Sequence, residues 1–201
     1  MKTKKLWPLL TAVGATVPVA LAAPRPEKHG GIQTIDELVD ELRASGAAGR
    51  DLVDLAISRV AREYTHHSAW HLWEHPETSL RNGRGWSHQY NTVLLVVLRR
   101  LGFEARMVQA SRVRGFHHPW WHVGHAWVKV VVAGRRYDAC ASRATNQAGN
   151  VGFVPVTAEV PFRTVTRWAM GLFLMPFVTA TVWRAWLTGR PVPDWVYRRR
   201  D

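Results

Sequence analysis

Apolar residues recur at helical spacing in two segments near the start of the folded region. The segment 35–42 carries apolar residues three and four positions apart and acidic residues in its first turn, which predicts an amphipathic helix. The same spacing predicts a second helix over 50–64. The segment 91–101 is apolar on nearly every side, so it predicts a central helix that its neighbours bury.

The pattern changes to short, β-branched and weakly alternating segments after the central helix. Strands are predicted over 103–113 and 122–132. The turn residues 133–134 and the segment 135–140 complete a hairpin with the second of these strands. A last strand is predicted over 151–156. Helices followed by antiparallel strands predict an α+β fold, in which helices pack on an antiparallel sheet.

Two uncharged runs lie outside this domain pattern. Leu6 to Ala23 follows three lysines and ends in small residues spaced Ala-x-Ala, which predicts a bacterial signal peptide or membrane anchor. The run 168–183 is interrupted by Pro176 and flanked by arginines, which predicts an interfacial or re-entrant segment, with burial on the domain as the alternative. The chain therefore divides into an exported or anchoring segment (1–23), a folded domain (24–162) and an apolar, basic C-terminal segment (163–201).

Charge and tryptophan content favour a membrane surface as a partner. The chain has 201 residues, enough for one core, with a formal charge of +12 and 11 Trp. Strong positive charge is typical of proteins that bind nucleic acid or an anionic membrane. The domain has no block of basic residues interleaved with aromatics, which argues against nucleic acid. We expect a basic protein that is membrane-associated or exported.

Cysteine and histidine content does not predict a metal or cofactor. The single Cys excludes an intramolecular disulfide and a thiol-based zinc site. Two groups of histidines could in principle hold a divalent ion, but no ordered carboxylate pattern completes either site. The groups are His67, His71 and His75, and His117, His118 and His122.

Three positions have the order of a nucleophile, a base and an orienting acid. Ser87 follows Gly85-Trp86 at the start of the apolar helix, where the helix dipole and a backbone N–H can stabilise an oxyanion. His125 lies in a strand about forty positions later, and Asp138 lies on the returning strand of the hairpin. An Asp that accepts from the imidazole would fix its tautomer for base catalysis. A helix N-cap explains Ser87 equally well, and a strand-end acid explains Asp138.

The residues from about Leu52 to Pro155 resemble a transglutaminase-like domain. The matching pieces are Gly85-Trp-Ser87, Leu98-Arg-Arg-Leu-Gly-Phe-Glu-Ala-Arg106, Gly124-His-Ala-Trp-Val128 and Gly134-Arg-Arg-Tyr-Asp138. The resemblance implies a papain-like fold and a Cys–His–Asp acyl-transfer site. Carried over to this chain, His125 is the base and Asp138 its orienter, while Ser87 stands where the family usually has Cys.

Two functions are consistent with this constellation. One is acyl transfer or amide hydrolysis through Ser87, His125 and Asp138, acting on a peptide or an acyl- or amide-bearing substrate. The other is a catalytically silent domain, a pseudoenzyme that binds a peptide or ligand at a membrane. Cys140 offers a second route to a nucleophile, because it shares a strand face with Asp138, although a buried Cys is also an ordinary small apolar residue. The cleft is expected to be lined by Trp86, His88, Gln89, Trp127 and Cys140.

Overall fold

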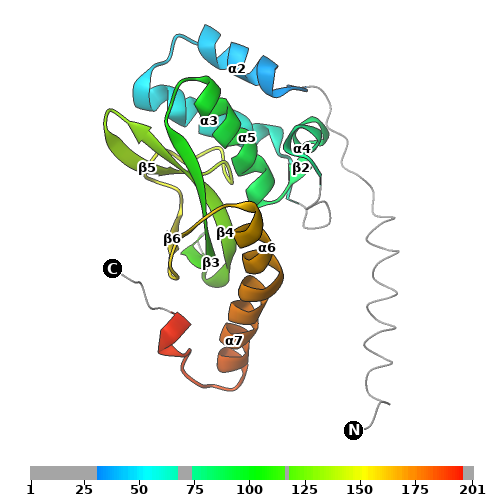
Figure 1. Cartoon of the computed structure of the whole chain (residues 1–201), viewed down its shortest axis with the longest axis vertical. Coiled ribbons are helices and arrows are strands. Elements are labelled where there is room, and N and C mark those ends of the chain that lie inside the picture. The colour runs from blue at the N-terminus through cyan, green and yellow to red at the C-terminus, as the bar shows by residue number, and fades with distance from the viewer. Residues whose placement is uncertain (1–30, 68–73, 116–117, 197–201) are drawn as a thin grey trace.

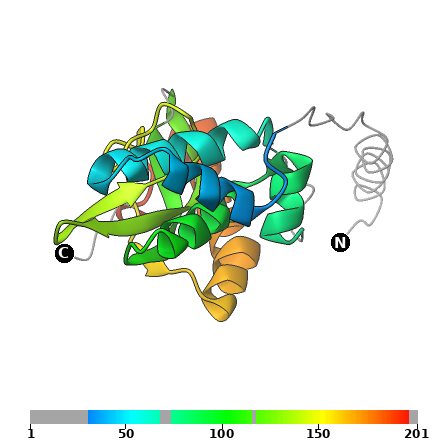
Figure 2. The same cartoon turned by 90° about the horizontal axis from the view of Figure 1, so that it is seen from above.

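A computed structural model describes residues 31–67, 74–115 and 118–196 (Figure 1). The predicted signal or anchor at 1–23 lies outside these residues. Figure 1 places the N-terminal helices at one end of the molecule and the C-terminal helix at the other, and Figure 2 is seen from the end that carries the N-terminal helices. The helices of the N-terminal half are α2 (Ile35–Ala44), α3 (Gly49–Glu63), α4 (Pro76–Asn82) and α5 (Ser87–Arg100).

Helix α2 begins at the predicted Ile35 and ends at Ala44, two residues beyond the predicted segment 35–42. The Thr34 hydroxyl accepts a hydrogen bond from the Glu37 backbone N–H at 3.2 Å, which caps the first turn. The apolar stripe at 35, 38, 39 and 42 is buried. Helix α3 buries a similar stripe and ends one residue before the predicted limit of 64.

Helix α5 is the buried centre of the domain, but it begins at Ser87, four residues before the predicted start at Asn91. The Gln89 side chain explains the earlier start, because its Oε1 accepts from the Trp86 backbone N–H at 2.9 Å and so caps the helix. At the other end, Gly102 adopts φ +92° and donates its N–H to the Arg99 carbonyl at 3.0 Å.

The sheet is antiparallel, with strand order β5-β4-β3-β6 and β7 paired to β3, which confirms the α+β class. The β4–β5 turn is tight: Ala133 (φ 49°) and Gly134 (φ 76°) both take positive φ, as a two-residue hairpin turn requires. This turn sets the register that pairs Lys129 with Asp138. The five strands are β3 (Ala105–Gly115), β4 (His118–Val132), β5 (Arg135–Ala139), β6 (Phe153–Pro155) and β7 (Val160–Pro161). A parallel pair of two-residue strands, β1 (His66–His67) and β2 (Arg84–Gly85), precedes α5.

The C-terminal helix is continuous through Pro176. It comprises α6 (Thr164–Ala169), the π-helical η3 (Met170–Leu174) and α7 (Met175–Leu187), and the short helix η4 (Asp194–Val196) follows. Proline has no N–H to donate to the preceding turn, and the wider π-helical turn before it accommodates that missing bond.

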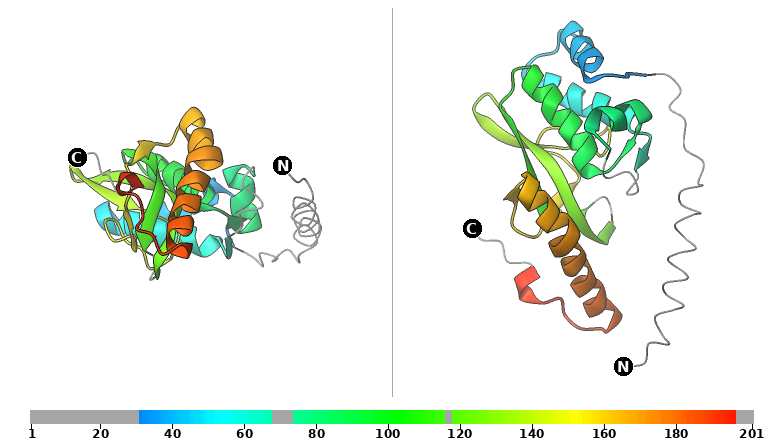
Figure 3. Two further views of the ribbon diagram at one scale, coloured as in Figure 1. Left: turned by 90° about the horizontal axis from the view of Figure 1, so that it is seen from below. Right: turned by 45° about the vertical axis from the view of Figure 1, so that its right-hand side comes forward.

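One face of the C-terminal helix packs on the domain and the other is exposed. The Met175 side chain lies directly over Gly124 of β4, where an added Cβ would be 2.2 Å from its sulfur. Residues 164–187 are long and apolar enough to cross a membrane, but only 17% of the most apolar window is buried. Figure 3 shows this helix extending along the sheet. The exposed apolar side chains are Val165, Trp168, Leu172, Phe173, Leu174, Phe177, Trp183, Trp186 and Leu187.

Candidate functional site

Ser87 is the first residue of α5 and its side chain faces a cavity of about 350 Å³. The residue is 6% exposed. The chain can approach this point because Gly85 has no side chain: a Cβ there would lie 3.0 Å from the Tyr64 ring. This cavity, which we call the Ser87 cavity, is lined on its apolar side by Trp168, Gly171, Leu172 and Met175 of the C-terminal helix.

His125 lies on β4, 4% exposed, with its Nε2 3.2 Å from the Cys140 sulfur. Phe153 meets the imidazole edge-on at 4.8 Å, and Trp127 stacks beside it at 6.3 Å. Burial, followed by the nearby charge of His67, lowers the pKa of His125 from 6.5 to about 3. The imidazole is therefore neutral at neutral pH.

Asp138 shares a sheet face with His125 but bonds to other groups. Its Oδ1 accepts from Trp127 Nε1 at 2.8 Å and forms an ion pair with Lys129 Nζ at 2.8 Å. Among the contacts between described residues, the thiol of Cys140 takes the place next to His125 Nε2 that we expected Asp138 to hold. The hairpin register is the reason, because it sets Asp138 opposite Lys129, four residues beyond His125. Asp138 is linked to the imidazole through Trp127, whose Nε1 it accepts from and whose ring stacks beside His125.

Cys140 is fully buried in a polar pocket. Asn91 Nδ2 lies 3.4 Å from its sulfur, and the Ser142 hydroxyl lies 3.3 Å away. Burial raises the pKa of the Cys140 thiol, and its hydrogen bonds with Ser142 and Asn91 only partly oppose this effect. The thiol is neutral and enclosed, which does not suit it to act as a nucleophile.

Asn91 is a positioning residue that the sequence analysis missed. Its Nδ2 donates to the Ala126 carbonyl at 2.6 Å, and its Oδ1 accepts from the Ala141 N–H at 2.9 Å. It therefore joins α5 to β4 and to the segment after β5, at the point where the two strands separate. The available signal was an amide two positions before the apolar run 93–98, one turn after Ser87.

The other predicted lining residues fall into three groups. Trp86 and His88 line the Ser87 cavity. Gln89 is buried, caps α5 and donates from Nε2 to the Glu74 carbonyl at 3.1 Å. Trp127 and Cys140 are part of the core beneath His125. Ser87 makes no hydrogen bond to His125 or Asp138 within the described part of the chain.

Within residues 31–67, 74–115 and 118–196, no three His, Cys, Asp or Glu side chains come together as a metal site. Of the histidines weighed as ligands, His71 and His117 lie outside these residues.

Comparison with known proteins gives a family match and several distant structural similarities. The sequence profile of the transglutaminase-like superfamily matches residues 37–140, about half of the chain. No curated protein matches the chain.

Three solved structures are similar over part of their length. A transglutaminase (TGase) has 14% identity and a TM-score of 0.44, covering 54% of this chain and 30% of its own. A protein described as a putative cysteine protease, from Cytophaga hutchinsonii, has 14% identity and a TM-score of 0.42, covering 60% and 42%. A protein described as a putative protease, from Parabacteroides distasonis, has 16% identity and a TM-score of 0.39, covering 64% and 28%. The chain spans less than half the length of each.

Proposed function

The chain belongs to the transglutaminase-like superfamily, and from this premise we propose that it is a catalytically silent binding domain that holds a peptide or an acyl-bearing ligand in the Ser87 cavity. The observation that carries this proposal is the pairing of His125 with the neutral, buried thiol of Cys140. A hydroxyl nucleophile depends wholly on a base that can accept its proton.

Protonating His125 in place would be costly. A pKa of about 3 instead of 6.5 means that protonating the imidazole in the folded protein costs roughly 5 kcal/mol more free energy than in water. Asp138, the acid predicted to offset this cost, is instead bonded to Trp127 Nε1 and paired with Lys129. A ligand-binding role needs only the cavity.

The placement of Ser87 favours acyl transfer or amide hydrolysis through Ser87, His125 and Asp138 as the second candidate function. Ser87 opens a 14-residue helix and borders a cavity. An oxyanion formed there would be stabilised by the helix N-terminus.

The experiment that separates the two functions rebuilds a complete thiol site. In Ser87→Cys/Cys140→Asp, the new carboxylate at 140 would accept from Asn91, Ser142 and His125, which would raise the His125 pKa and favour a thiolate at 87. We expect iodoacetamide to label this variant at least about tenfold faster than the matched Ser87→Cys/Cys140→Ser. The labelling is followed by intact mass.

The wild-type chain should form no covalent adduct with a fluorophosphonate or an activated ester under the same conditions. An adduct that is lost in Ser87→Ala would contradict the silent domain and establish serine-based chemistry instead.

We also propose that the chain works at an anionic membrane surface. Support comes from the exposed apolar face of residues 164–187 and from the arginines near both ends of this helix, Arg163, Arg167, Arg184 and Arg190. Because the opposite face packs on β3 and β4, the helix is better suited to lie in the interface than to cross the bilayer alone.

A further inference from the structure

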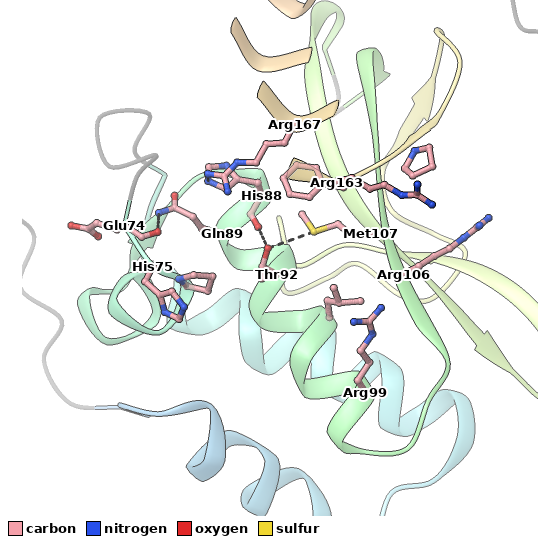
Figure 4. A pocket seen from close by; sticks show the side chains of 14 residues that line it. Glu74, His75, His88, Gln89, Thr92, Arg99, Arg106, Met107, Arg163 and Arg167 are labelled. Carbon is pink, nitrogen blue, oxygen red and sulfur yellow. Dashed lines mark hydrogen bonds between the residues drawn. The ribbon is translucent and has the colours of Figure 1, made fainter. Parts of the chain in front are cut away.

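A second cavity, of about 600 Å³, opens beside the Ser87 cavity between α5, β3 and the start of α6 (Figure 4). Four arginines from these three elements line it, and we call it the arginine basin. Arg99 comes from α5, Arg106 from β3, and Arg163 and Arg167 from the beginning of α6.

The basin has little negative charge of its own. The single acid among its described lining residues is Glu74, which forms an ion pair with Arg84. In the described part of the chain, no carboxylate lies within ion-pair distance of Arg99, Arg106 or Arg163. Cations gathered in one cavity repel one another, and a bound anion would relieve that repulsion.

The two cavities share a wall. His88, Phe162 and Arg167 line both. The Arg167 guanidinium lies 3.4 Å from His88 Nε2 and 5.9 Å from the Phe162 ring centre, which holds it at the boundary. On the far side of this wall the Ser87 cavity is mainly apolar, with Trp168, Leu172 and Met175 along the C-terminal helix.

We propose that the arginine basin binds the phosphate group of an amphiphile whose acyl chain enters the Ser87 cavity. This inference rests on the proposed ligand-binding role of that cavity and names its ligand class. Guanidinium groups bind phosphate oxygens in pairs, and a phosphate dianion matches several arginines better than a single carboxylate does. The apolar wall beyond Arg167 provides a surface on which the acyl chain attached to the phosphate can be buried from water.

The ligand class is tested with three soluble probes on the full-length chain by isothermal titration calorimetry. The probes are dihexanoyl phosphatidic acid below its critical micelle concentration, dihexanoylglycerol, and inorganic phosphate. We expect the phosphatidic acid to bind at least about tenfold more tightly than either of the others, since each lacks one half of the recognised structure.

Matched variants test whether the phosphate group binds in the arginine basin and the acyl chains bind in the Ser87 cavity. Arg106→Ala/Arg163→Ala should weaken phosphatidic acid binding at least about tenfold, whereas Arg135→Ala/Arg136→Ala, which removes the same charge from the exposed β4–β5 hairpin, should change it less than about twofold. Gly171→Leu should also weaken it, because an added Cβ meets no atom within 4 Å and the side chain can extend into the Ser87 cavity. Circular dichroism melts verify folding.

Three results would overturn the proposal. Equal affinity for phosphatidic acid and dihexanoylglycerol would show that phosphate is not recognised, while leaving the Ser87 cavity as a binding site. Equal affinity for phosphatidic acid and inorganic phosphate would show that the acyl chains do not contribute to binding. The proposed role of the Ser87 cavity would then be wrong as well. If the basin and hairpin variants lose the same affinity for phosphatidic acid, the arginines would act only through the net charge of the protein and not through a specific site.

Discussion

At the scale of single residues, the chemistry of the site is governed by the burial of His125. Its imidazole lies between Phe153 and Trp127, with Nε2 against the Cys140 sulfur. These neighbours can pack against a neutral ring, but they offer no negative charge to an imidazolium. The same burial that weakens His125 as a base therefore links its protonation to the stability of the fold.

We predict a specific pH dependence of stability from this residue. The folded pKa of about 3 lies below the ordinary value of 6.5. Between these values the unfolded chain binds a proton that the folded chain does not, so the His125 contribution to stability falls as pH falls. The slope approaches about 1.4 kcal/mol per pH unit below the unfolded pKa.

The variant His125→Gln has no titrating group at this position, so it lacks this pH-dependent part of the unfolding free energy. Its stability at pH 7 can differ from that of the wild type without affecting the comparison. Urea unfolding of both proteins between pH 7 and pH 4 measures the difference. We expect the gap between wild type and variant to narrow by roughly 2–3 kcal/mol over that range. Parallel pH profiles for the two proteins would mean that His125 titrates normally in the folded state.

Sequence patterning predicted which side chains share a face here, but not which of them meet. Alternation along β4 and β5 places His125, Trp127, Asp138 and Cys140 on one side of the sheet. Their offsets along the strands depend on the register, which a two-residue turn with positive φ at both positions sets. For that reason Asp138 lies opposite Lys129, and Cys140 lies against His125.

At the scale of elements, long periodic segments were predictable and short capped ones were not. Helix α2 and the strands of the β4–β5 hairpin could be predicted, because their apolar residues repeat with the spacing of a helix or of a strand. The first turn of α5 carries no apolar period, and its start depends on the Gln89 cap. Helix α4 was not predicted, because it is short and begins with Pro76, a residue that is tolerated at the first position of a helix but does not mark one by a period.

The C-terminal helix approaches β4 closely where Met175 lies over Gly124, and we predict that a side chain at position 124 will loosen the helix. A Cβ at position 124 would overlap Met175, at 2.2 Å from its sulfur and 2.5 Å from Cγ. Gly124→Ala should therefore cost about 1–3 kcal/mol in unfolding free energy. It should also speed limited proteolysis in the segment 164–187.

The matched double variant Gly124→Ala/Met175→Ala removes the overlap and should recover part of that loss relative to Met175→Ala alone. The double-mutant cycle gives the coupling between the two positions. Independent, additive effects would show that α7 does not rest on β4 at this point.

At the scale of the whole molecule, two features adjoin each other. The C-terminal helix has many exposed apolar side chains, and the arginine basin lies beside the start of that helix (Figure 4). A surface that pairs exposed aromatic side chains with arginines suits the boundary between acyl chains and anionic headgroups. The basin and the Ser87 cavity would then open toward the side from which an amphiphile arrives.

We predict that the chain binds anionic vesicles through this helix face. Phe173 and Phe177 are 72% and 60% exposed, and the Phe177 ring stacks on Trp195 of η4 at 5.8 Å. Replacing both in Phe173→Ser/Phe177→Ser should lower the vesicle partition coefficient by at least about tenfold, because each phenyl ring contributes apolar area to the inserted face. Val154→Ser, which removes an exposed apolar side chain from β6, serves as the matched control.

Flotation with phosphatidylcholine vesicles, with and without phosphatidylglycerol, measures the partitioning of the full-length chain. Binding should be stronger with the anionic lipid and should weaken as salt is added, since arginine–headgroup attraction is screened. If the phenylalanine variant and the Val154 variant partition alike, the exposed face is not the membrane-binding surface.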